Sequence, residues 1–291
     1  MFQRSCIPLC LIAMPMTVLF AEDAAPADVP PEPPRWANTG KIGAFVSNVV
    51  TGNNDSSRDP AISGANDTLA YRLALEAGLD FREGKHSVDQ RLLGKYGRKK
   101  DDDVAWVDDT DEVRYDGVYR YQFHQPHFAY GSWGWESVFT DPDPDNDLFS
   151  PGLLKSAVGY GQLYEDFWAK SSKAEVRIGA AVRKRYGDSL TAADRETETG
   201  LEIFGRLEHQ RDDSLRYYVQ YEGFAEFKDM GHIINVITAG LTASLSKYLS
   251  LEMGLRAFYE SRPDSVAQAP GDGYGEWSLR QDTLIGLAYT W

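Results

Sequence analysis

The chain has 291 residues and a formal net charge of −14 at pH 7. A charge of this sign repels the phosphate backbone, which argues against a nucleic-acid partner. Its two cysteines, Cys6 and Cys10, lie in an apolar N-terminal segment, so the rest of the chain offers no disulfide and no cysteine-ligated metal.

The N-terminal segment predicts export. An apolar run from Cys6 to Phe20 follows Arg4 and ends at the small residue Ala21. This order is typical of a secretory signal peptide, and the run is too short and too rich in proline for a good membrane-spanning helix. We therefore expect a cleavable signal peptide over residues 1–21. The Pro-rich, acidic segment 22–35 predicts an extended periplasmic linker.

Residues 36–291 alternate between apolar and polar side chains. From Thr68 to Phe81, for example, Leu73 and Leu75 share one parity while Arg72 and Glu76 share the other. A period of two is typical of β-strands that have one apolar and one polar face. About twelve such segments follow one another, each longer than the usual globular mean of about six residues.

The lengths of the connections alternate as well. Long connections are expected near 51–66, 98–112, 141–152, 187–195 and 262–275. Short ones fall near 82–85, 124–127, 169–172, 211–214 and 246–248, and the outer connection 228–231 is the one exception to the alternation. This pattern is typical of outer-membrane barrels, and in lipid only helices and closed barrels satisfy their backbone groups. The sequence predicts an all-β, antiparallel transmembrane β-barrel of about 12 strands over 36–291, against the alternative of a soluble β-sandwich.

The C-terminal segment shows the alternation clearly. Its apolar parity comprises Trp277, Leu279, Ile285, Leu287, Tyr289 and Trp291. The terminal aromatic residue is similar to the signal at the end of bacterial outer-membrane barrels. We expect an outer-membrane location, with the lipid bilayer and the outer-membrane assembly machinery as partners, the latter through the strand ending in Trp291. We also expect a monomer.

The chain resembles the salt-induced outer-membrane proteins, a family defined by a domain of unknown function. The resemblance is carried by Asp116–Tyr121 (DGVYRY), the aromatic strand Phe128–Phe139, Val158–Gly161 (VGYG), Glu175–Ala181 (EVRIGAA) and Gln281–Trp291 (QDTLIGLAYTW). The chain departs from the family pattern in its Asp-rich loops and in ending in Trp where Phe is commoner. The resemblance implies an outer-membrane location and no established chemistry, and it transfers no functional residue.

The polar parity places charges of both signs in the predicted lumen. The candidate lumen-lining residues are Arg72, Glu76, Arg114, Arg120, Glu175, Arg177, Arg183, Glu202, Arg206, Arg216, Glu222, Glu252, Arg256 and Glu260. One interpretation is a salt-bridged plug that fills the barrel, because unpaired charges in a confined lumen are costly. The other is a narrow polar pore whose charged rings set solute preference. Twelve strands lie between the filled eight-stranded and the open sixteen-stranded barrels, so size does not decide.

Two further patterns suggest metal sites. Asp141, Asp143, Asp145 and Asp147 place oxygens at every second position, a spacing that suits Ca²⁺. This segment lacks the glycine turn and downstream glutamate of an EF-hand, and a solvated acidic loop is the favoured interpretation. Histidines at 124 and 127 flank a turn without an evident third ligand, so we expect no metal and no cofactor.

The functional expectation is a narrow polar channel or a structural barrel that supports the envelope. The alternative is an outer-membrane hydrolase, since twelve-stranded phospholipases place a serine and a histidine on the lipid-facing side. The sequence offers no motif that pairs a serine with any of its five histidines. We therefore predict no catalytic residues and a protein that is not an enzyme.

Overall fold

The computed structural model describes residues 35–53, 57–59, 62, 68–99, 107–139, 148–187, 190, 195–263, 266 and 272–291. The expected signal peptide, nearly all of the expected linker, and the acidic positions Asp141, Asp143, Asp145 and Asp147 lie outside these residues. The described part of the chain forms twelve strands: β1 (Arg35–Gly52), β2 (Thr68–Glu83), β3 (His86–Lys99), β4 (Val107–His124), β5 (His127–Ser137), β6 (Gly152–Glu165), β7 (Ser172–Tyr186), β8 (Thr197–Asp212), β9 (Leu215–Glu226), β10 (Ile233–Ser244), β11 (Leu249–Glu260) and β12 (Trp277–Thr290). No helix of the described residues is long and apolar enough to cross a membrane.

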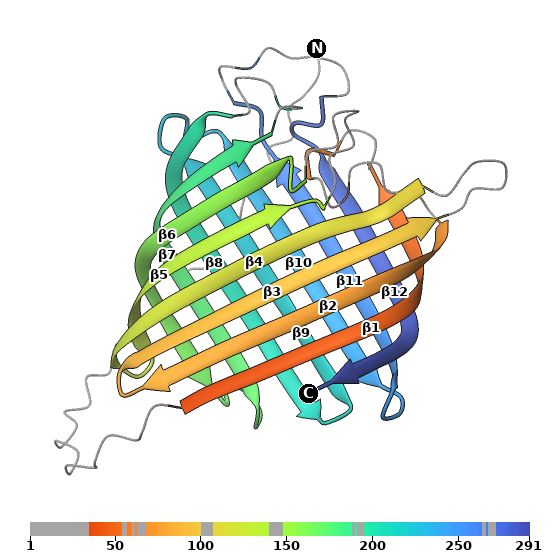
Figure 1. Ribbon diagram of the computed structural model, residues 1–291. Coiled ribbons are helices and arrows are strands. Elements are labelled where there is room, and N and C mark those ends of the chain that lie inside the picture. The colour runs from red at the N-terminus through yellow and green to blue at the C-terminus, as the bar shows by residue number, and fades with distance from the viewer. Residues whose placement is uncertain are drawn as a thin grey trace, which may run out of the picture. The chain divides into compact units, whose positions relative to one another are not determined.

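The strands form one closed barrel. Each strand pairs antiparallel with its neighbours in sequence, and β12 pairs with β1 to complete the ring (Figure 1). At this seam the backbone of Gly40 both donates to and accepts from that of Trp291, at 3.1 and 3.0 Å. The Trp291 indole occupies the space that a side chain at position 40 would need, so a larger residue there would displace the indole from the seam. The predicted all-β antiparallel barrel of twelve strands is confirmed.

The faces of the strands are inverted relative to a soluble sheet. The apolar residues Leu73, Val176 and Met253 are 53%, 54% and 42% exposed, whereas Arg72 and Arg177 are 2% and 6% exposed. Neighbouring side chains of a strand point to opposite faces, so the apolar parity forms the outer wall and the charged parity faces the lumen. This arrangement suits a barrel surrounded by lipid.

Exposed aromatic side chains gather toward the strand ends. Those toward the short-turn end include Trp36, Tyr121, Phe123, Tyr217, Tyr289 and Trp291, and those toward the opposite end include Phe227 and Trp277. Amphipathic aromatic rings favour the membrane–water interface, so these two groups fit the two edges of an apolar band.

The connections confirm the alternation in part. The short turns 84–85, 125–126, 166–171, 213–214 and 245–248 lie at the end of the barrel that carries the C-terminus (Figure 1). One expectation was wrong: the connection expected at 98–112 is shorter, because β4 begins at Val107 and its acidic start pairs with the end of β3 past a register shift at Gly97/Arg98. Backbone groups make the ladder, so acidic side chains do not by themselves end a strand.

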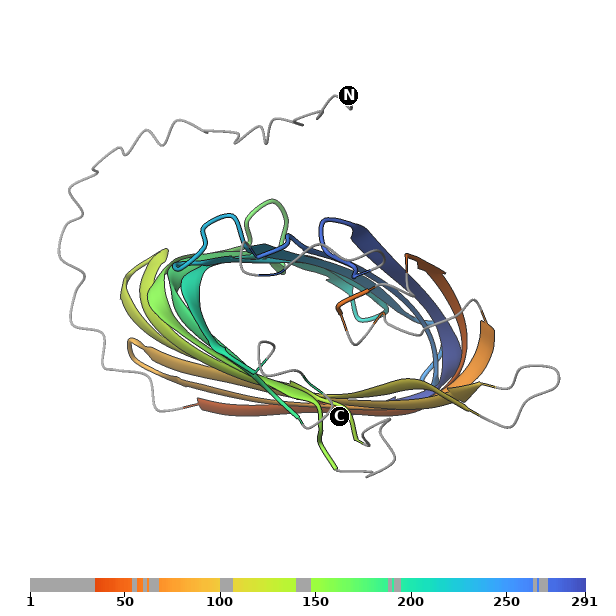
Figure 2. The ribbon, with the colours of Figure 1, turned by 90° about the horizontal axis from the view of Figure 1, so that it is seen from above.

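The lumen is not wholly polar. Viewed along its axis the barrel wall is a flattened ring (Figure 2), and an apolar cluster lies inside it. The buried members of this cluster are Ile62, Phe128, Tyr130, Ala157, Ala181, Phe224, Ile234 and Phe258. Ile62 belongs to the first outer connection and is fully buried, so that connection contributes to the packed interior. The sequence pattern did not anticipate this apolar packing on the charged parity.

Candidate functional site

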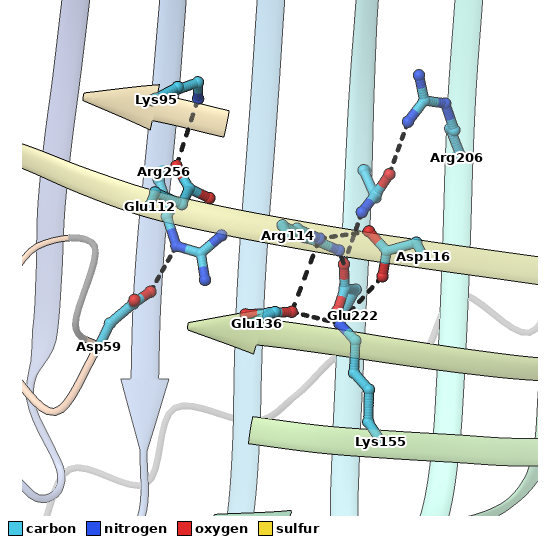
Figure 3. A network of polar contacts seen from close by, with 11 residues as sticks. Asp59, Lys95, Glu112, Arg114, Asp116, Glu136, Lys155, Arg206, Glu222 and Arg256 are labelled. Carbon is cyan, nitrogen blue, oxygen red and sulfur yellow. Dashed lines mark hydrogen bonds and ion pairs between the residues drawn. The ribbon is translucent and has the colours of Figure 1, made fainter. Parts of the chain in front are cut away.

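We call the half of the lumen next to the long connections the long-loop half. A network of charged side chains crosses the lumen there (Figure 3). Arg114 Nη2 of β4 lies 3.1 Å from Glu222 Oε1 of β9, and Lys155 Nζ of β6 lies 3.3 Å from Glu222 Oε2. Lys155 also meets Glu136 Oε1 of β5 at 2.5 Å, and Arg114 meets Asp116 Oδ2 at 2.5 Å. Since β9 is not a neighbour of β4 or β6 in the sheet, these contacts join facing walls. We call these five residues the central network.

Neutral and charged neighbours extend the central network along the wall. Arg206 Nη1 donates to the Gln220 side-chain oxygen at 2.8 Å, and Gln220 donates in turn to Glu222 at 2.6 Å. Lys95 and Glu112, on β3 and β4, approach to 3.5 Å. Chains of hydrogen-bonded polar groups in a confined space restrict one another's positions, which holds the crossing rigid.

The first outer connection is tethered inside the long-loop half. Asp59, whose side chain is 3% exposed, accepts a hydrogen bond of 2.5 Å from Arg256 of β11. Its neighbour Arg58 donates to Glu260 at 3.0 Å and stacks on the Tyr274 ring at 4.0 Å. Two charged contacts from consecutive residues therefore hold this segment against β11 and the last outer connection.

A histidine completes the long-loop rim. His232, in the connection before β10, lies 3.0 Å from Glu226 and 3.1 Å from Glu260, one carboxylate at each ring nitrogen. Glu260 also meets Arg185 of β7 at 3.6 Å. Burial alone would lower the pKa of His232, but the hydrogen bonds to Glu260 and Glu226 outweigh it and raise that pKa above its ordinary value.

The other half of the lumen, next to the short turns, is called the short-turn half and contains a second cluster of buried charged side chains. Arg120 of β4 forms a bidentate pair with Glu175 of β7, with both contacts at 3.0 Å, and also contacts Asp89 of β3. Arg177 lies 3.4 Å from Glu175, and its guanidinium stacks on the Phe204 ring at 3.8 Å. The aromatic ring covers the guanidinium face that the carboxylate does not meet.

The remaining pairs of the short-turn half lie within one strand or join neighbouring or next-but-one strands. Arg206 and Arg216 share Glu208, at 2.9 and 2.7 Å, and Arg91 meets Asp80 at 2.6 Å. Lys41 meets both Glu252 and Glu76, while Arg72 meets Asp282 nearer the long-loop ends of β2 and β12.

A cavity of about 280 Å³ lies beside the central network. It is lined by the cations Arg58, Lys155, Arg183, Arg185 and Arg256, by the anions Asp59, Asp111, Glu112, Glu136, Glu202 and Glu222, and by apolar residues that include Leu153, Phe224, Ile234, Val236 and Phe258. A space with both charge signs and an apolar wall suits a small polar or amphipathic solute.

The fourteen sequence-predicted lumen candidates occupy the charged face of their strands, and the structure groups them unevenly. It brings Arg114 together with Glu222, and Arg120 and Arg177 with Glu175. The others meet different partners: Glu202 accepts from the Tyr130 hydroxyl at 3.3 Å, Arg183 lies over the Phe224 ring, and Glu76 and Arg216 have side chains 47% and 53% exposed.

Sequence reasoning missed several members of the site. Glu136 and Lys155 share the charged parity, but each lies in a strand of mostly aromatic, glycine or apolar residues, which obscures the alternation. Arg58 and Asp59 lie in a connection, where side chains do not alternate with a period of two and the pattern predicts nothing about their direction. His232 also lies in a connection, and no sequence signal places it between two glutamates.

The histidines give no support to a hydrolase. In the part of the chain that the structure describes, none of them pairs with a serine. His86 and His127 contact tyrosine hydroxyls, His124 contacts the backbone of its own turn, and the ring of His209 packs against aromatic rings.

A closed antiparallel barrel with an apolar outer band and a charged lumen defines a transmembrane β-barrel. The sequence profile of one family matches residues 61–272, which is most of the chain. The chain belongs to this family, which is described as protein of unknown function, DUF481. No curated protein matches the chain with significant similarity.

Solved structures with a similar fold include bacterial porins and channels. An anion-selective porin from Comamonas acidovorans has 10% identity and a TM-score of 0.38, with 89% of this chain and 100% of the porin covered. An outer membrane channel from Pseudomonas putida F1 has 9% identity and a TM-score of 0.44, with 87% and 95% covered. The outer membrane channel DcaP of Acinetobacter baumannii has 9% identity and a TM-score of 0.36, with 89% and 97% covered.

Proposed function

We propose that this protein is a narrow polar channel of the bacterial outer membrane. In this proposal residues 1–21 direct export, residues 22–35 form a periplasmic linker, and the assembly machinery recognises the strand that ends in Trp291. The mature barrel acts as a monomer. The apolar outer band supports the membrane location, since such a surface is costly to expose to water.

One observation carries the channel proposal: the central network spans the lumen beside a cavity. Arg114 and Lys155 come from one side and Glu222 from the other, and all three side chains are at most 25% exposed. A barrel that served only as a structural wall has no need for a cavity of mixed polarity next to this crossing. The network would act as the constriction, and its charges would set which ions pass.

The mixed signs predict weak selectivity and small conductance. Glu222 forms ion pairs with two cations, Arg114 and Lys155, so removing its charge changes both the width and the net charge of the constriction. We expect the refolded wild-type protein to give small unitary steps in a planar bilayer. Glu222→Gln should enlarge the steps at least about twofold and shift the reversal potential in a salt gradient toward anion preference.

Glu165→Gln is the matched control. It makes the same chemical change at a side chain that is 48% exposed at the end of β6, where Arg82 lies 3.5 Å away. Its conductance should equal that of the wild type. Absence of unitary steps from the wild type and from Glu222→Gln, both folded, would overturn the channel proposal in favour of the structural barrel.

The salt-induced label forms a separate part of the proposal, supported by the sequence resemblance described above. We expect the abundance of the protein in its host to rise when external NaCl is raised. Quantitative mass spectrometry of outer-membrane fractions measures this abundance. An unchanged abundance after the salt increase would contradict induction by salt without affecting the channel proposal.

A further inference from the structure

Arg183 differs from the other cations of the cavity. Arg58, Lys155, Arg185 and Arg256 each lie within 4 Å of a carboxylate oxygen. Among the described residues, no carboxylate lies within ion-pair distance of Arg183, whose guanidinium instead lies 5.0 Å from the centre of the Phe224 ring. The described part of the chain therefore places one positive charge in the cavity without a counterion.

The carboxylates of the cavity are already occupied. Glu136 and Glu222 belong to the central network, Asp59 is held by Arg256, and Glu112 meets Lys95. The other two accept neutral donors: Asp111 accepts from the Phe139 backbone N–H at 2.6 Å, and Glu202 accepts from the Tyr130 hydroxyl at 3.3 Å. A cationic ligand would have to displace one of these internal partners. An anionic ligand meets a charged donor that is free to pair, and charge-assisted hydrogen bonds to guanidinium are roughly twice as strong as neutral ones.

The wall next to Arg183 is apolar. Phe224, Phe258 and Ile234 are buried members of the interior apolar cluster, and all three line the cavity. A ligand that places its charge on Arg183 would lay its remaining atoms against these side chains. At about 280 Å³ the cavity lies near the lower end of ligand-site volumes, which are roughly 300–1,000 Å³, so the ligand is small.

We propose that the cavity binds a small monocarboxylate with a compact apolar body, its carboxylate on Arg183 and its body on Phe224 and Phe258. This inference rests on the proposed channel in one respect, since it names the class of solute that the channel takes up. Binding itself needs only the folded barrel, so it is measured apart from conduction.

Isothermal titration calorimetry of the mature barrel refolded in detergent tests the proposal, with phenylacetate as the probe and 2-phenylethanol as its neutral analogue. We expect phenylacetate to bind and the alcohol to bind at least about tenfold more weakly, because it lacks the charge. Arg183→Gln should weaken phenylacetate binding by about tenfold or more, while Arg183→Lys, which keeps the charge, should retain part of it. Phe224→Leu should weaken both probes by a few-fold, because the apolar contact is reduced.

Arg82→Gln is the matched control, since this side chain is 58% exposed at the end of β2, and it should bind phenylacetate as the wild type does. Circular dichroism verifies that each variant is folded. Equal binding by Arg183→Gln, equal binding of the alcohol, or no binding by the wild type would each overturn the proposal. Unitary conductance without phenylacetate binding would overturn only this inference, whereas binding without conductance would overturn only the channel.

Discussion

The two halves of the lumen use the same charged residue types in different arrangements. In the long-loop half, single carboxylates serve several cations from distant elements: Glu222 meets Arg114 and Lys155, and Glu260 meets Arg58 and Arg185. In the short-turn half most pairs lie within one strand or join strands at most two apart, as Arg216 of β9 does with Glu208 of β8, and many of these side chains are open to water. The bidentate pair of Arg120 with Glu175 and the exposed pair of Arg82 with Glu165 join strands that are farther apart.

Because of this difference, the ion pairs of the two halves are expected to contribute unequally to the free energy of unfolding. A pair at the water-filled end is screened and contributes little, whereas a buried partner that is removed leaves a desolvated charge behind. The long-loop half also contains the cavity and the tethered segment at Arg58 and Asp59. We therefore expect substitutions in the long-loop half to have large effects and those at the short-turn end to have small ones.

Glu260→Ala should have the largest effect. The Glu260 side chain is 1% exposed and meets Arg58, Arg185 and His232, so its loss leaves two arginines and one histidine without this partner. We expect the free energy of unfolding to fall by about 3–5 kcal/mol. Urea titration in lipid vesicles, followed by tryptophan fluorescence, measures it. Glu165→Ala, at an exposed strand end, is the control, and a loss below about 1 kcal/mol for Glu260→Ala would show that the shared pairing is not stabilising.

Asp59→Asn should release the tethered segment. The substitution keeps the side-chain shape but removes the charge that Arg256 meets at 2.5 Å, a contact of about 1.5–3 kcal/mol. Because the only native cysteines are Cys6 and Cys10, in the expected signal peptide, Ser57→Cys provides a single thiol in the mature chain. We expect a water-soluble maleimide to label this thiol about tenfold or more faster in the Asp59→Asn background. An unchanged rate would mean that the Asp59 charge does not hold this segment.

His232 predicts a pH dependence confined to the long-loop half. Its pKa is raised above the ordinary 6.5 in the folded protein, because the hydrogen bonds to Glu260 and Glu226 outweigh burial; Arg58, Arg185 and Glu198 are the other charges nearby. The stabilisation is therefore complete below pH 6.5 and is lost as pH rises through the raised pKa. The loss should be of the order of 1 kcal/mol. Urea titrations from pH 5 to 9 measure it, and His232→Gln should flatten the curve over the affected range. A wild-type curve that matches the variant's would contradict the assignment.

Arg216→Gln should have the smallest effect. The side chain is 53% exposed and Glu208 keeps Arg206 as a second partner, so we expect a loss of about 0.2–1 kcal/mol. The same urea titration measures it. A loss comparable to that of Glu260→Ala would remove the distinction between the two halves of the lumen.

The barrel fold, with one apolar and one charged face on each strand, could be predicted from the local pattern of the chain. The pleat of a strand fixes a period of two, so the parity of Leu73 against Arg72, or Val176 against Arg177, is a local property of the chain. Strand number followed from counting such segments, and antiparallel closure followed from the short turns between them. That the candidate charges share one parity was predictable for the same reason.

The ion-pair partners of these charges depend on the tertiary structure and could not be predicted from the local pattern. Whether Arg114 reaches Glu222 depends on the tilt of β4 and β9 and on the flattening of the ring, which no local pattern contains. The inward course at Arg58, Asp59 and Ile62 likewise depends on space left by the walls. Among the described residues Arg183 has no carboxylate partner for the same reason, because a side chain in a closed lumen finds its partners across the barrel as well as along the strand.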